Sequence, residues 1–393
     1  MIVAAVLLAG CTGAGPPPEG GAPPTERASA GEARDLAGVC PATVVVQAAW
    51  YPTADLATPF QLFSADWRID AARKRVSGSL VSGGQDTGVD LEFRAGGPAT
   101  GFQTGPAVLH ADRTVTLAFA NLDEIIAASA TQPVQSVFAP LNGDPQVLIW
   151  DRRSLPDVDG IVDIGQTDVP VLHSANAGAV FGYLTGSGIL RASQLDASYD
   201  GSPSRFVAAR GKVVVQGYAT NEPYIYEHIP AWGRPVSYQL IQETGYPNYA
   251  DMLVIRSADR ERLAPCLHRL VPILQRAQAE FMAAPSAALD RIVKAMAAFR
   301  AGFVYDRGNA EFGACQLRDL GLVSATRAGT LGAVEQDKVD RMLDVVRPLL
   351  AAQRRPARSG LTAADVATND FVDPRIGLPT TFRTPRCETR RSW

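Results

Sequence analysis

Aromatic and polar side chains follow several short hydrophobic stretches of the sequence. Rings such as Trp50 can stack on a flat ligand, and the oxygen atoms of Asn, Asp, Glu and Ser can accept its hydrogen bonds. Such groups gathered at one rim predict a binding site for a small, flat, polar molecule. The candidate residues are Trp50, Tyr51, Asn121, Asp123, Ser174, Asn176, Asp200, Ser202, Glu222 and Tyr224.

Glu222 is the strongest single candidate. It follows the apolar stretch that begins at Val213. A carboxylate at the end of an apolar strand must be hydrated, paired with a cation or bound to a ligand. The structural alternative is an ion pair with Arg205 or Arg210. We expect Glu222 to face a ligand, with Tyr224 beside it.

The other candidates also have structural alternatives. Trp50 and Tyr51 could simply cover the core at the end of a strand. Asn121 could be only the N-cap of the helix that follows, a position that favours Asn. Asp200 and Ser202 lie in the turn sequence "SYDGSPSRF", which could hold a polar group through backbone N–H groups.

The elements that position these residues follow an alternating pattern. Nearly continuous Val, Ile and Leu runs indicate strands with both faces covered, and helical segments lie between them, which predicts an α/β fold. In such sheets ligands bind beyond the carboxyl ends of the strands. The chain becomes helical from 259 to 355. The predicted strands begin at Thr43, Val89, Thr114, Val134, Gln146, Val169, Lys212 and Val236, and the predicted helices span 123–130, 177–185 and 204–210.

Composition and missing motifs exclude several classes of function. A net charge of -3 and a pI near 5.9 give no basic surface for nucleic acid. The four histidines show no metal-ligand spacing, and neither a nucleophile elbow nor a phosphate-binding loop occurs. We therefore expect no catalytic residue, no metal and no cofactor.

The N-terminal residues "MIVAAVLLAGC" have the apolar core of a signal peptide and are too short to span a bilayer. The end of this stretch, "LLAGC", resembles a bacterial lipobox, which implies cleavage after residue 10 and lipidation of Cys11. The Pro- and Gly-rich stretch that follows predicts a disordered, flexible linker over 11–40. The alternative is a buried N-terminal segment.

Four further cysteines remain for the folded part, which we expect to begin near Cys40. An exported protein permits disulfides, and four cysteines allow three pairings. Sequence alone does not choose among them. The residues are Cys40, Cys266, Cys315 and Cys387.

Three stretches resemble the solute-binding proteins of ABC importers, in the branch around uptake of nitrate, sulfonates and precursors of thiamine or riboflavin. They are "VVVQAAWYPTAD", "QGYATNEPYIYE" and "VATNDFVDPRIGLP". The resemblance extends from Val44 to Leu378. Two features depart from it: Asp55 stands where relatives carry His-x-Gly, and the insert 66–87 is long for a strand-to-helix connection.

The resemblance implies a two-lobed, type II periplasmic-binding-protein-like α/β fold with a helical C-terminal part. Lobe one would comprise 41–144 and 240–393, and lobe two would comprise 145–239. The lobes would close by hinge motion around a ligand. The protein would be a monomeric lipoprotein on the extracytoplasmic face of the cell membrane, and its partners would be the permease and ATPase subunits of the importer.

The residues at the predicted rim favour a neutral or cationic heteroaromatic solute, such as a pyrimidine or a flavin precursor, because an anion requires Arg, Lys or bare N–H groups. An oxyanion such as nitrate, a sulfonate or taurine is the first alternative. A second alternative is an enzyme on the same fold that makes thiamine pyrimidine from pyridoxal phosphate held on a lysine. The third is a surface receptor lipoprotein.

Overall fold

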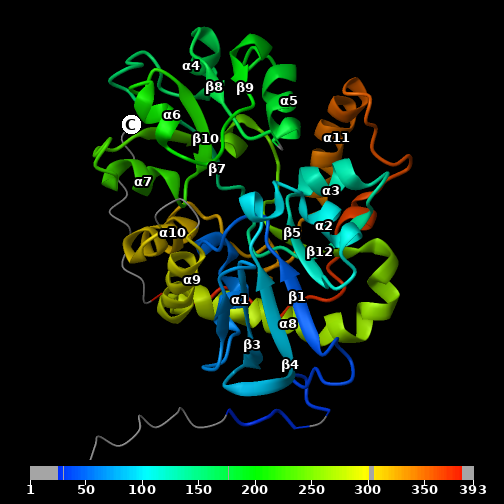
Figure 1. The fold of residues 1–393 in the computed structure, drawn as a ribbon. Helices are drawn as coiled ribbons and strands as arrows, with labels where there is room; N and C mark the ends of the chain where they lie inside the picture. Colours follow the sequence, from blue (N-terminus) through cyan, green and yellow to red (C-terminus); the bar gives the residue numbers. More distant parts are fainter. Residues whose placement is uncertain (1–24, 30, 176, 301–304, 383–393) are drawn as a thin grey trace, which may run out of the picture.

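The structure, a computed structural model, describes residues 25–29, 31–175, 177–300 and 305–382. Its strands form two separate sheets, one of seven strands and one of five. Figure 1 shows the sheets in two lobes, one above the other, each with its own helices. The predicted two-lobed α/β fold is confirmed.

The seven-stranded sheet is the centre of lobe one, and its strand order is β2-β3-β4-β1-β5-β12-β6. β1 runs parallel to β4 and β5, whereas β12 is antiparallel to β5 and β6. The strands are β1 (Thr43–Gln47), β2 (Arg68–Asp70), β3 (Arg75–Ser82), β4 (Gln85–Arg94), β5 (Leu117–Ala120), β6 (Val134–Phe138) and β12 (Met252–Arg256).

Lobe two is built on the five-stranded sheet, whose order is β11-β7-β10-β8-β9. Its strands are β7 (Gln146–Trp150), β8 (Val171–Leu172), β9 (Leu195–Asp196), β10 (Val214–Tyr218) and β11 (Ser237–Leu240). Its helices are α4 (Ile161–Gln166), α5 (Gly178–Gly186), α6 (Ser204–Ala208) and α7 (Glu222–His228).

Two segments connect the lobes. Residues 139–145 lead from β6 to β7, and residues 241–251 lead from β11 back to β12. Because β12 pairs with both β5 and β6, the chain leaves lobe one once and returns to the interior of its sheet.

The valines of β1 show why its sequence is a continuous apolar run. Val44 and Val46 belong to the core that contains α8, whereas Val45 belongs to the core that contains α3 and α11. Successive residues of a strand point to opposite faces, so both faces of this sheet are covered. The remaining helices are α1 (Thr58–Gln61), α2 (Gly105–Ala111), α3 (Leu122–Ala128), α8 (Arg260–Ala283), α9 (Ser286–Phe299), α10 (Arg307–Asp319), α11 (Gln336–Ala352) and α12 (Ala363–Val366).

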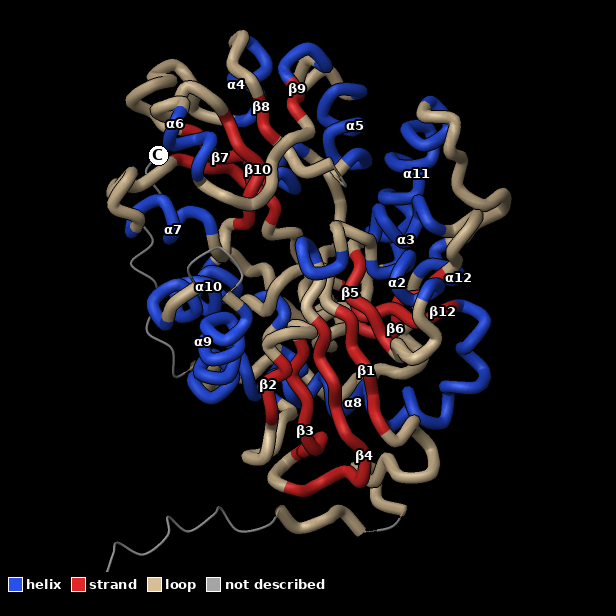
Figure 2. The backbone as a smooth tube through the Cα atoms, in the orientation of Figure 1, coloured by secondary structure: helices blue, strands red, loops and turns tan. Residues whose placement is uncertain are grey.

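Two C-terminal helices contact both lobes. α10 packs against α9 and against α7 of lobe two, and α11 packs against α3 of lobe one and α5 of lobe two. Figure 2 shows α10 and α11 on opposite sides of the space between the lobes. The C-terminal part of the chain therefore encloses the region between the two sheets from both sides.

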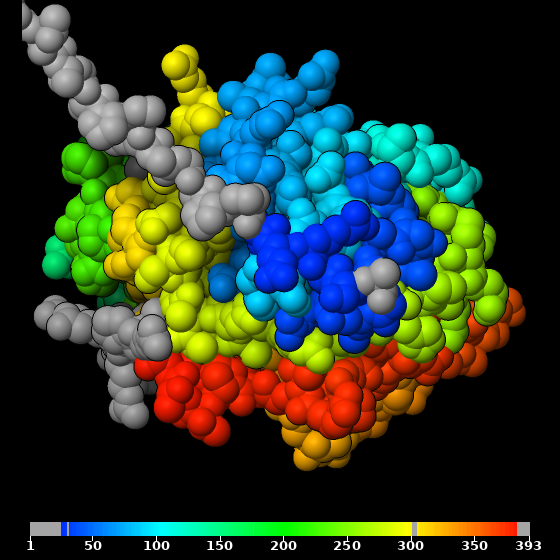
Figure 3. All heavy atoms as spheres, turned by 90° about the horizontal axis from the view of Figure 1, so that it is seen from below, coloured from blue at the N-terminus to red at the C-terminus, as the bar shows by residue number. Residues whose placement is uncertain are grey.

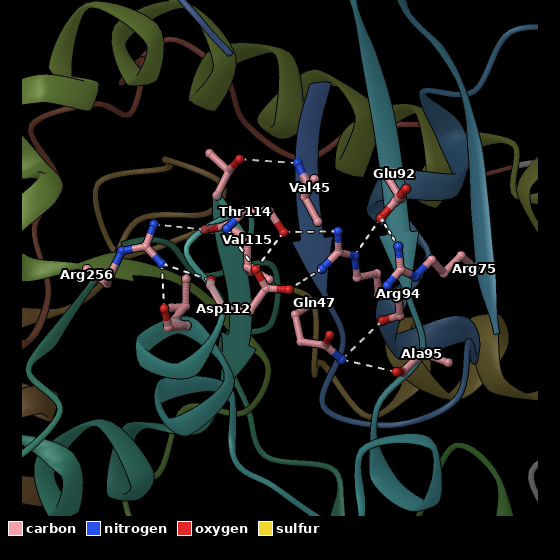
Figure 4. A network of polar contacts seen from close by, with 12 residues as sticks. Val45, Gln47, Arg75, Glu92, Arg94, Ala95, Asp112, Thr114, Val115 and Arg256 are labelled. Atoms are coloured by element: carbon pink, nitrogen blue, oxygen red, sulfur yellow. Dashed lines mark hydrogen bonds and ion pairs between the residues drawn. The ribbon is translucent and has the colours of Figure 1, made fainter. Parts of the chain in front are cut away.

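A buried arginine fixes the far end of β12. Arg256 is 3% exposed, and its guanidinium donates to the carbonyl oxygens of Leu109 and Val115, at 2.5 and 2.9 Å, and pairs with Asp259. Figure 4 shows Arg256 beside Val115 and the neighbouring pair of Arg94 and Asp112. Each guanidinium nitrogen of Arg256 donates to an oxygen atom. These hydrogen bonds stabilise the packing of β12 on α2 and on the segment before β5.

The folded part begins earlier than we predicted. The backbone of Asp86 donates to Glu26 and accepts from Ala28, both at 2.9 Å, and Leu36 is fully buried. Figure 3 shows these N-terminal residues, in dark blue, lying across the lower end of lobe one. The predicted flexible linker is therefore wrong for its last part, because Glu26, Ala28 and Leu36 have backbone hydrogen bonds to the β3–β4 hairpin.

A disulfide joins Cys40 to Cys266 of α8. It belongs to one of the three pairings that the sequence left open, and it ties the N-terminal segment to lobe one across a separation of 226 residues. Cys387 lies outside the described residues. So do the predicted signal peptide 1–10, the lipidation site Cys11 and residues 12–24 of the predicted linker. None of the helices formed by the described residues has the length and apolar character needed to cross a membrane.

The insert 66–87 adds strands to lobe one. It contributes β2 and β3 and the first residues of β4, and these three strands form an antiparallel meander at the edge of the sheet. The meander extends the sheet away from lobe two.

Candidate functional site

A cavity of about 140 Å³ lies between the lobes. Lobe one contributes residues that follow β1 and β5 or precede α2 and β12, and lobe two contributes residues from the ends of β8, β9 and β10 and the start of β7. The carboxyl ends of parallel strands from both sheets therefore meet here, as expected for an α/β binding site. The polar and aromatic lining residues are Trp50, Thr53, Asp55, Gln103, Thr104, Asn121, Asp123, Glu124, Gln146, Ser174, Tyr199, Gln216, Tyr218, Asn221, Glu222 and Asp251.

Trp50 forms part of the wall where the lobes meet. Its indole lies against Gly97 of lobe one and Gly201 of lobe two, so closely that a Cβ atom at either glycine would come within 2.5 or 2.8 Å of the ring. Both glycines have positive φ, 58° and 86°. Glycine at these positions leaves the space that the indole occupies between the two lobes.

Asp55 lies in the short 3-10 helix Ala54–Leu56, between β1 and α1. It is 6% exposed, and its buried Oδ1 atom accepts no hydrogen bond from the described residues. Burial raises the pKa of this carboxyl above its ordinary value.

Asp251 immediately precedes β12. Its backbone N–H donates to Oδ1 of Asn121 at 3.0 Å, which holds the two chain segments together. The Asp251 side chain is 4% exposed, and its carboxylate receives no hydrogen bond from the described part of the chain. Burial raises its pKa well above the ordinary value, and the neighbouring charges of Asp55, Asp144 and Glu124 raise it further.

Asp123 and Glu124 begin α3 at the end of β5. Oδ2 of Asp123 accepts from the hydroxyl group of Tyr246 at 2.9 Å, and Oε2 of Glu124 accepts from the backbone N–H of Asn121 at 3.2 Å. Burial raises the pKa of Asp123 to about 6. Burial and the charge of Asp123 raise the pKa of Glu124 to about 8.

A chain of hydrogen bonds runs along the cavity from lobe one into the connecting segments. The backbone N–H of Asp123 donates to Oδ1 of Asn248 at 3.3 Å, and Nδ2 of Asn248 donates to Oδ2 of Asp144 at 2.8 Å. Asn248 is fully buried. The two connecting segments, 139–145 and 241–251, are therefore linked to each other and to α3.

The same chain continues into lobe two. Nε2 of Gln146 donates to Oδ2 of Asp144 at 3.3 Å, and Nε2 of Gln216 donates to Oε1 of Gln146 at 2.9 Å. Oε1 of Gln216 accepts from the backbone N–H of Ser174 at 2.9 Å. Because each amide uses both its donor and its acceptor, these side chains have fixed orientations.

Glu222 is the first residue of α7 and lies beside β10. Its Oε2 atom accepts from the backbone N–H of Tyr218 at 2.6 Å, and its side chain packs on Gly217, where a Cβ atom would come within 3.0 Å of it. Burial raises the pKa of Glu222 to about 7. Arg205 pairs instead with Asp196 at 2.9 Å, so the predicted alternative of an ion pair between Glu222 and Arg205 is wrong.

The charged side chains of the described cavity wall are all acidic. Five carboxyl groups line it, and no lysine, arginine or histidine is among its described lining residues. Within the described chain, no three His, Cys, Asp or Glu side chains are grouped so that they could hold a metal ion. The wall can therefore accept hydrogen bonds and attract positive charge, while an anion would find few donors there. The carboxyl groups belong to Asp55, Asp123, Glu124, Glu222 and Asp251.

The structure brings half of the predicted site residues together at the cavity: Trp50, Asn121, Asp123, Ser174 and Glu222. Asn121 is also the N-cap residue of α3, so its structural alternative and its place at the cavity are compatible. Asn176 lies outside the described residues. Whether the five cavity residues bind a ligand remains a prediction.

Four predicted residues lie elsewhere. Tyr51 is 6% exposed and belongs to the core of lobe one. Tyr224 stacks on His228 with ring centroids 3.8 Å apart. The exposed Asp200 accepts from the backbone N–H of Ser202 at 2.9 Å within a local turn. None of these four is among the described lining residues.

Sequence reasoning missed Glu124, Gln146, Tyr199, Gln216 and Asp251 as lining residues. Gln146 and Gln216 interrupt apolar strands with an amide, and this is a signal that could have been used. Asp251 gave no signal, because the strand that follows it was not predicted.

No protein-family model matches the chain, and no curated protein matches its sequence. Solved structures do match. The periplasmic aliphatic sulphonate binding protein SsuA from Escherichia coli is 12% identical, covers 89% of this chain and 97% of its own, and gives a TM-score of 0.53. The alkanesulfonate-binding protein SsuA from Xanthomonas axonopodis pv. citri, bound to MOPS, is 10% identical, covers 84% and 99%, and gives a TM-score of 0.52. Both are named as binding proteins. The chain therefore has the two-lobed periplasmic-binding-protein fold of type II, as its motifs predicted.

Proposed function

We propose that this chain is the substrate-binding protein of an ABC importer and that it captures a small heteroaromatic solute in the cavity between its lobes. The observation that carries the proposal is that cavity, which both lobes line and which joins an aromatic wall to many hydrogen-bond acceptors. A ligand that contacts both lobes stabilises the closed arrangement, which is the physical basis of capture by closure.

The lining supports a heteroaromatic ring with N–H donors. Trp50 and Tyr199 can pack on a flat ring. The side-chain oxygen atoms of Asp55, Asp251 and Glu222 can accept from ring nitrogens or amino groups. The lining is mixed polar and apolar, as in most small-molecule sites.

An oxyanion such as a sulfonate is the second candidate, and the names of the similar solved structures favour it. The charge of this cavity speaks against it, because five carboxyl groups line the wall and its described residues include no arginine or lysine. A protonated carboxyl can donate one hydrogen bond, so the comparison of anions with heteroaromatic compounds must be made by experiment.

The lining gives no support to an enzyme that holds pyridoxal phosphate on a lysine, because no described lining residue is a lysine. A surface receptor with a collapsed cleft is disfavoured because a cavity that both lobes line is open between them. The lipid anchor at Cys11, the extracytoplasmic location, the permease and ATPase partners and the monomeric state belong to the proposal. So do the lobe boundaries 41–144 with 240–393 and 145–239.

Thermal-shift screening of the purified full-length chain tests this function. The panel comprises aminopyrimidines, flavin precursors, nitrate, taurine and alkanesulfonates. A heteroaromatic compound that binds will raise the Tm, and the rise will grow with the logarithm of its concentration above Kd. Trp50→Ala should weaken that compound at least tenfold, or about 1.4 kcal/mol, while Phe382→Ala, at an exposed aromatic residue outside the cavity lining, should not. Stabilisation by sulfonates alone would reject the heteroaromatic solute and establish the second candidate.

A further inference from the structure

We infer that the captured solute is a cation, and that its positively charged nitrogen is held by the carboxylates of Asp55 and Asp251 while its ring faces Trp50. The inference rests on the proposed function, because it assumes that the cavity binds a solute. It goes beyond that function by assigning the charge of the solute and the two residues that select it.

The first support is the state of the two carboxyl groups. Both side chains are more than nine-tenths buried and line the cavity. Oδ1 of Asp55 accepts no hydrogen bond from the described residues. The carboxylate of Asp251 likewise receives none from them, since the residue's one hydrogen bond uses its backbone N–H. Buried polar atoms normally have partners, so the unpartnered Oδ1 atom of Asp55, at the same cavity as the Asp251 carboxylate, indicates that a donor is supplied by a ligand.

The second support is the backbone of Asp251, whose φ is 50°. This left-handed conformation is uncommon for residues other than glycine, although Asn and Asp adopt it more often than the rest. Folding alone would therefore favour Gly or Asn here, because either would avoid burying a carboxylate. Aspartate at this position stabilises the protein only if a cation or a donor meets it.

The third support is the charge of every element that faces the pair. Glu222 of α7 lies across the cavity, and Asp123 and Glu124 of α3 line it on the lobe-one side. Behind them Asp144 joins the connecting segments. The nearby cation is that of Lys338, whose ammonium lies over the ring of Tyr249, 3.8 Å from its centroid, and which does not line the cavity. A cationic solute would relieve the repulsion among these groups, whereas an anion would add to it.

Three probes with the same ring test the inference on the full-length chain: benzamidine as cation, benzamide as neutral compound and benzenesulfonate as anion. We expect binding in that order at pH 8, with benzamidine at least tenfold tighter than benzamide. Asp55→Asn and Asp251→Asn should each weaken benzamidine at least tenfold and change benzamide less than twofold. Asp340→Asn, at an exposed aspartate of α11, is the charge control and should change neither.

The Tm of the ligand-free variants provides a second readout that needs no probe. Removal of an unpaired buried charge should raise the Tm at pH 8. Asp251→Gly should raise it further than Asp251→Asn, because glycine also suits the positive φ. An unchanged or lowered Tm in all three variants, with no preference for benzamidine, would overturn the inference. So would tighter binding of benzenesulfonate than of benzamidine.

Loss of charge selection and loss of solute binding would give different results. If benzamide and benzamidine bind equally and the variants change neither, the cavity binds solutes but does not select for charge. If no probe and no member of the larger solute panel changes the Tm, the proposed function itself fails.

Discussion

Replacement of Glu222 by glutamine should make the protein less sensitive to pH. Glu222 has a pKa of about 7 in the folded protein, raised from 4.5 by burial. The folded protein therefore holds this proton more tightly than the unfolded chain does. Stability from this group is greatest at low pH and falls as the pH rises from about 4.5 through about 7.

The size of the effect follows from the two pKa values. A group whose pKa rises from 4.5 to about 7 costs about 2.5 kcal/mol of folding stability between pH 5 and pH 8. Glu222 is partly exposed, so solvent screening makes this value an upper limit, and we expect about 1.5–2.5 kcal/mol. Glutamine can still accept from the N–H of Tyr218 but cannot ionise, so Glu222→Gln should remove this loss.

Urea unfolding at pH 5 and pH 8 measures the effect. The free energy of unfolding of wild type should fall more between the two pH values than that of Glu222→Gln, by about 1.5–2.5 kcal/mol. Glu227→Gln, at an exposed glutamate of the same helix, should behave as wild type. An equal loss in wild type and in Glu222→Gln would refute the burial of this carboxyl and, with it, the closed cavity around it.

Three further predictions concern the hinge, the disulfide and the wall between the lobes. Asn248→Leu removes two buried hydrogen bonds and should lower the free energy of unfolding by about 2–4 kcal/mol; a loss below about 0.5 kcal/mol would show that the chain of amides is not required. Replacing Cys40 and Cys266 together by alanine should cost about 2–5 kcal/mol in urea unfolding, and equal stability of the oxidised wild type and the variant would contradict a disulfide there. Gly201→Val should weaken solute binding in titration calorimetry, because its side chain would occupy the place of the Trp50 ring; an unchanged affinity would mean that the lobes do not meet at this contact.

The strands that the sequence predicted best are those covered on both faces. β1, β5, β6, β7 and β10 are continuous apolar runs because helices pack on each side, and such runs are readable without a structure. β3 contains Gly78 and alternating serines in an edge meander, so it has no such run. β12 is a short apolar run directly before a long helix, where periodicity alone does not distinguish a strand from a helix.

The same reasoning explains which site residues were found. Asn121, Asp123 and Ser174 follow predicted strands, so the rule of strand ends placed them at the cavity. Asp251 was missed because β12 is antiparallel to its neighbours, so that the residue before the strand, rather than after it, faces the cavity. The sequence does not show that β12 runs antiparallel to β5 and β6.

Side-chain direction explains the errors at the tyrosines. Tyr224 lies two positions beyond Glu222 in α7, which turns it by about 200° around the helix axis, toward α10. Tyr51 adjoins Trp50 in an irregular stretch, where its side chain enters the core of lobe one. Adjacent residues of suitable type therefore do not share one site.

The central claim is that a small solute binds between the two lobes. A crystal structure of the full-length chain with the compound that raises its Tm most would test this claim most directly. We predict that the solute lies within hydrogen-bond distance of Asp251 and Glu222, with its ring against Trp50. A solute bound at any other surface, or a cleft that stays empty at saturating concentration, would contradict the account.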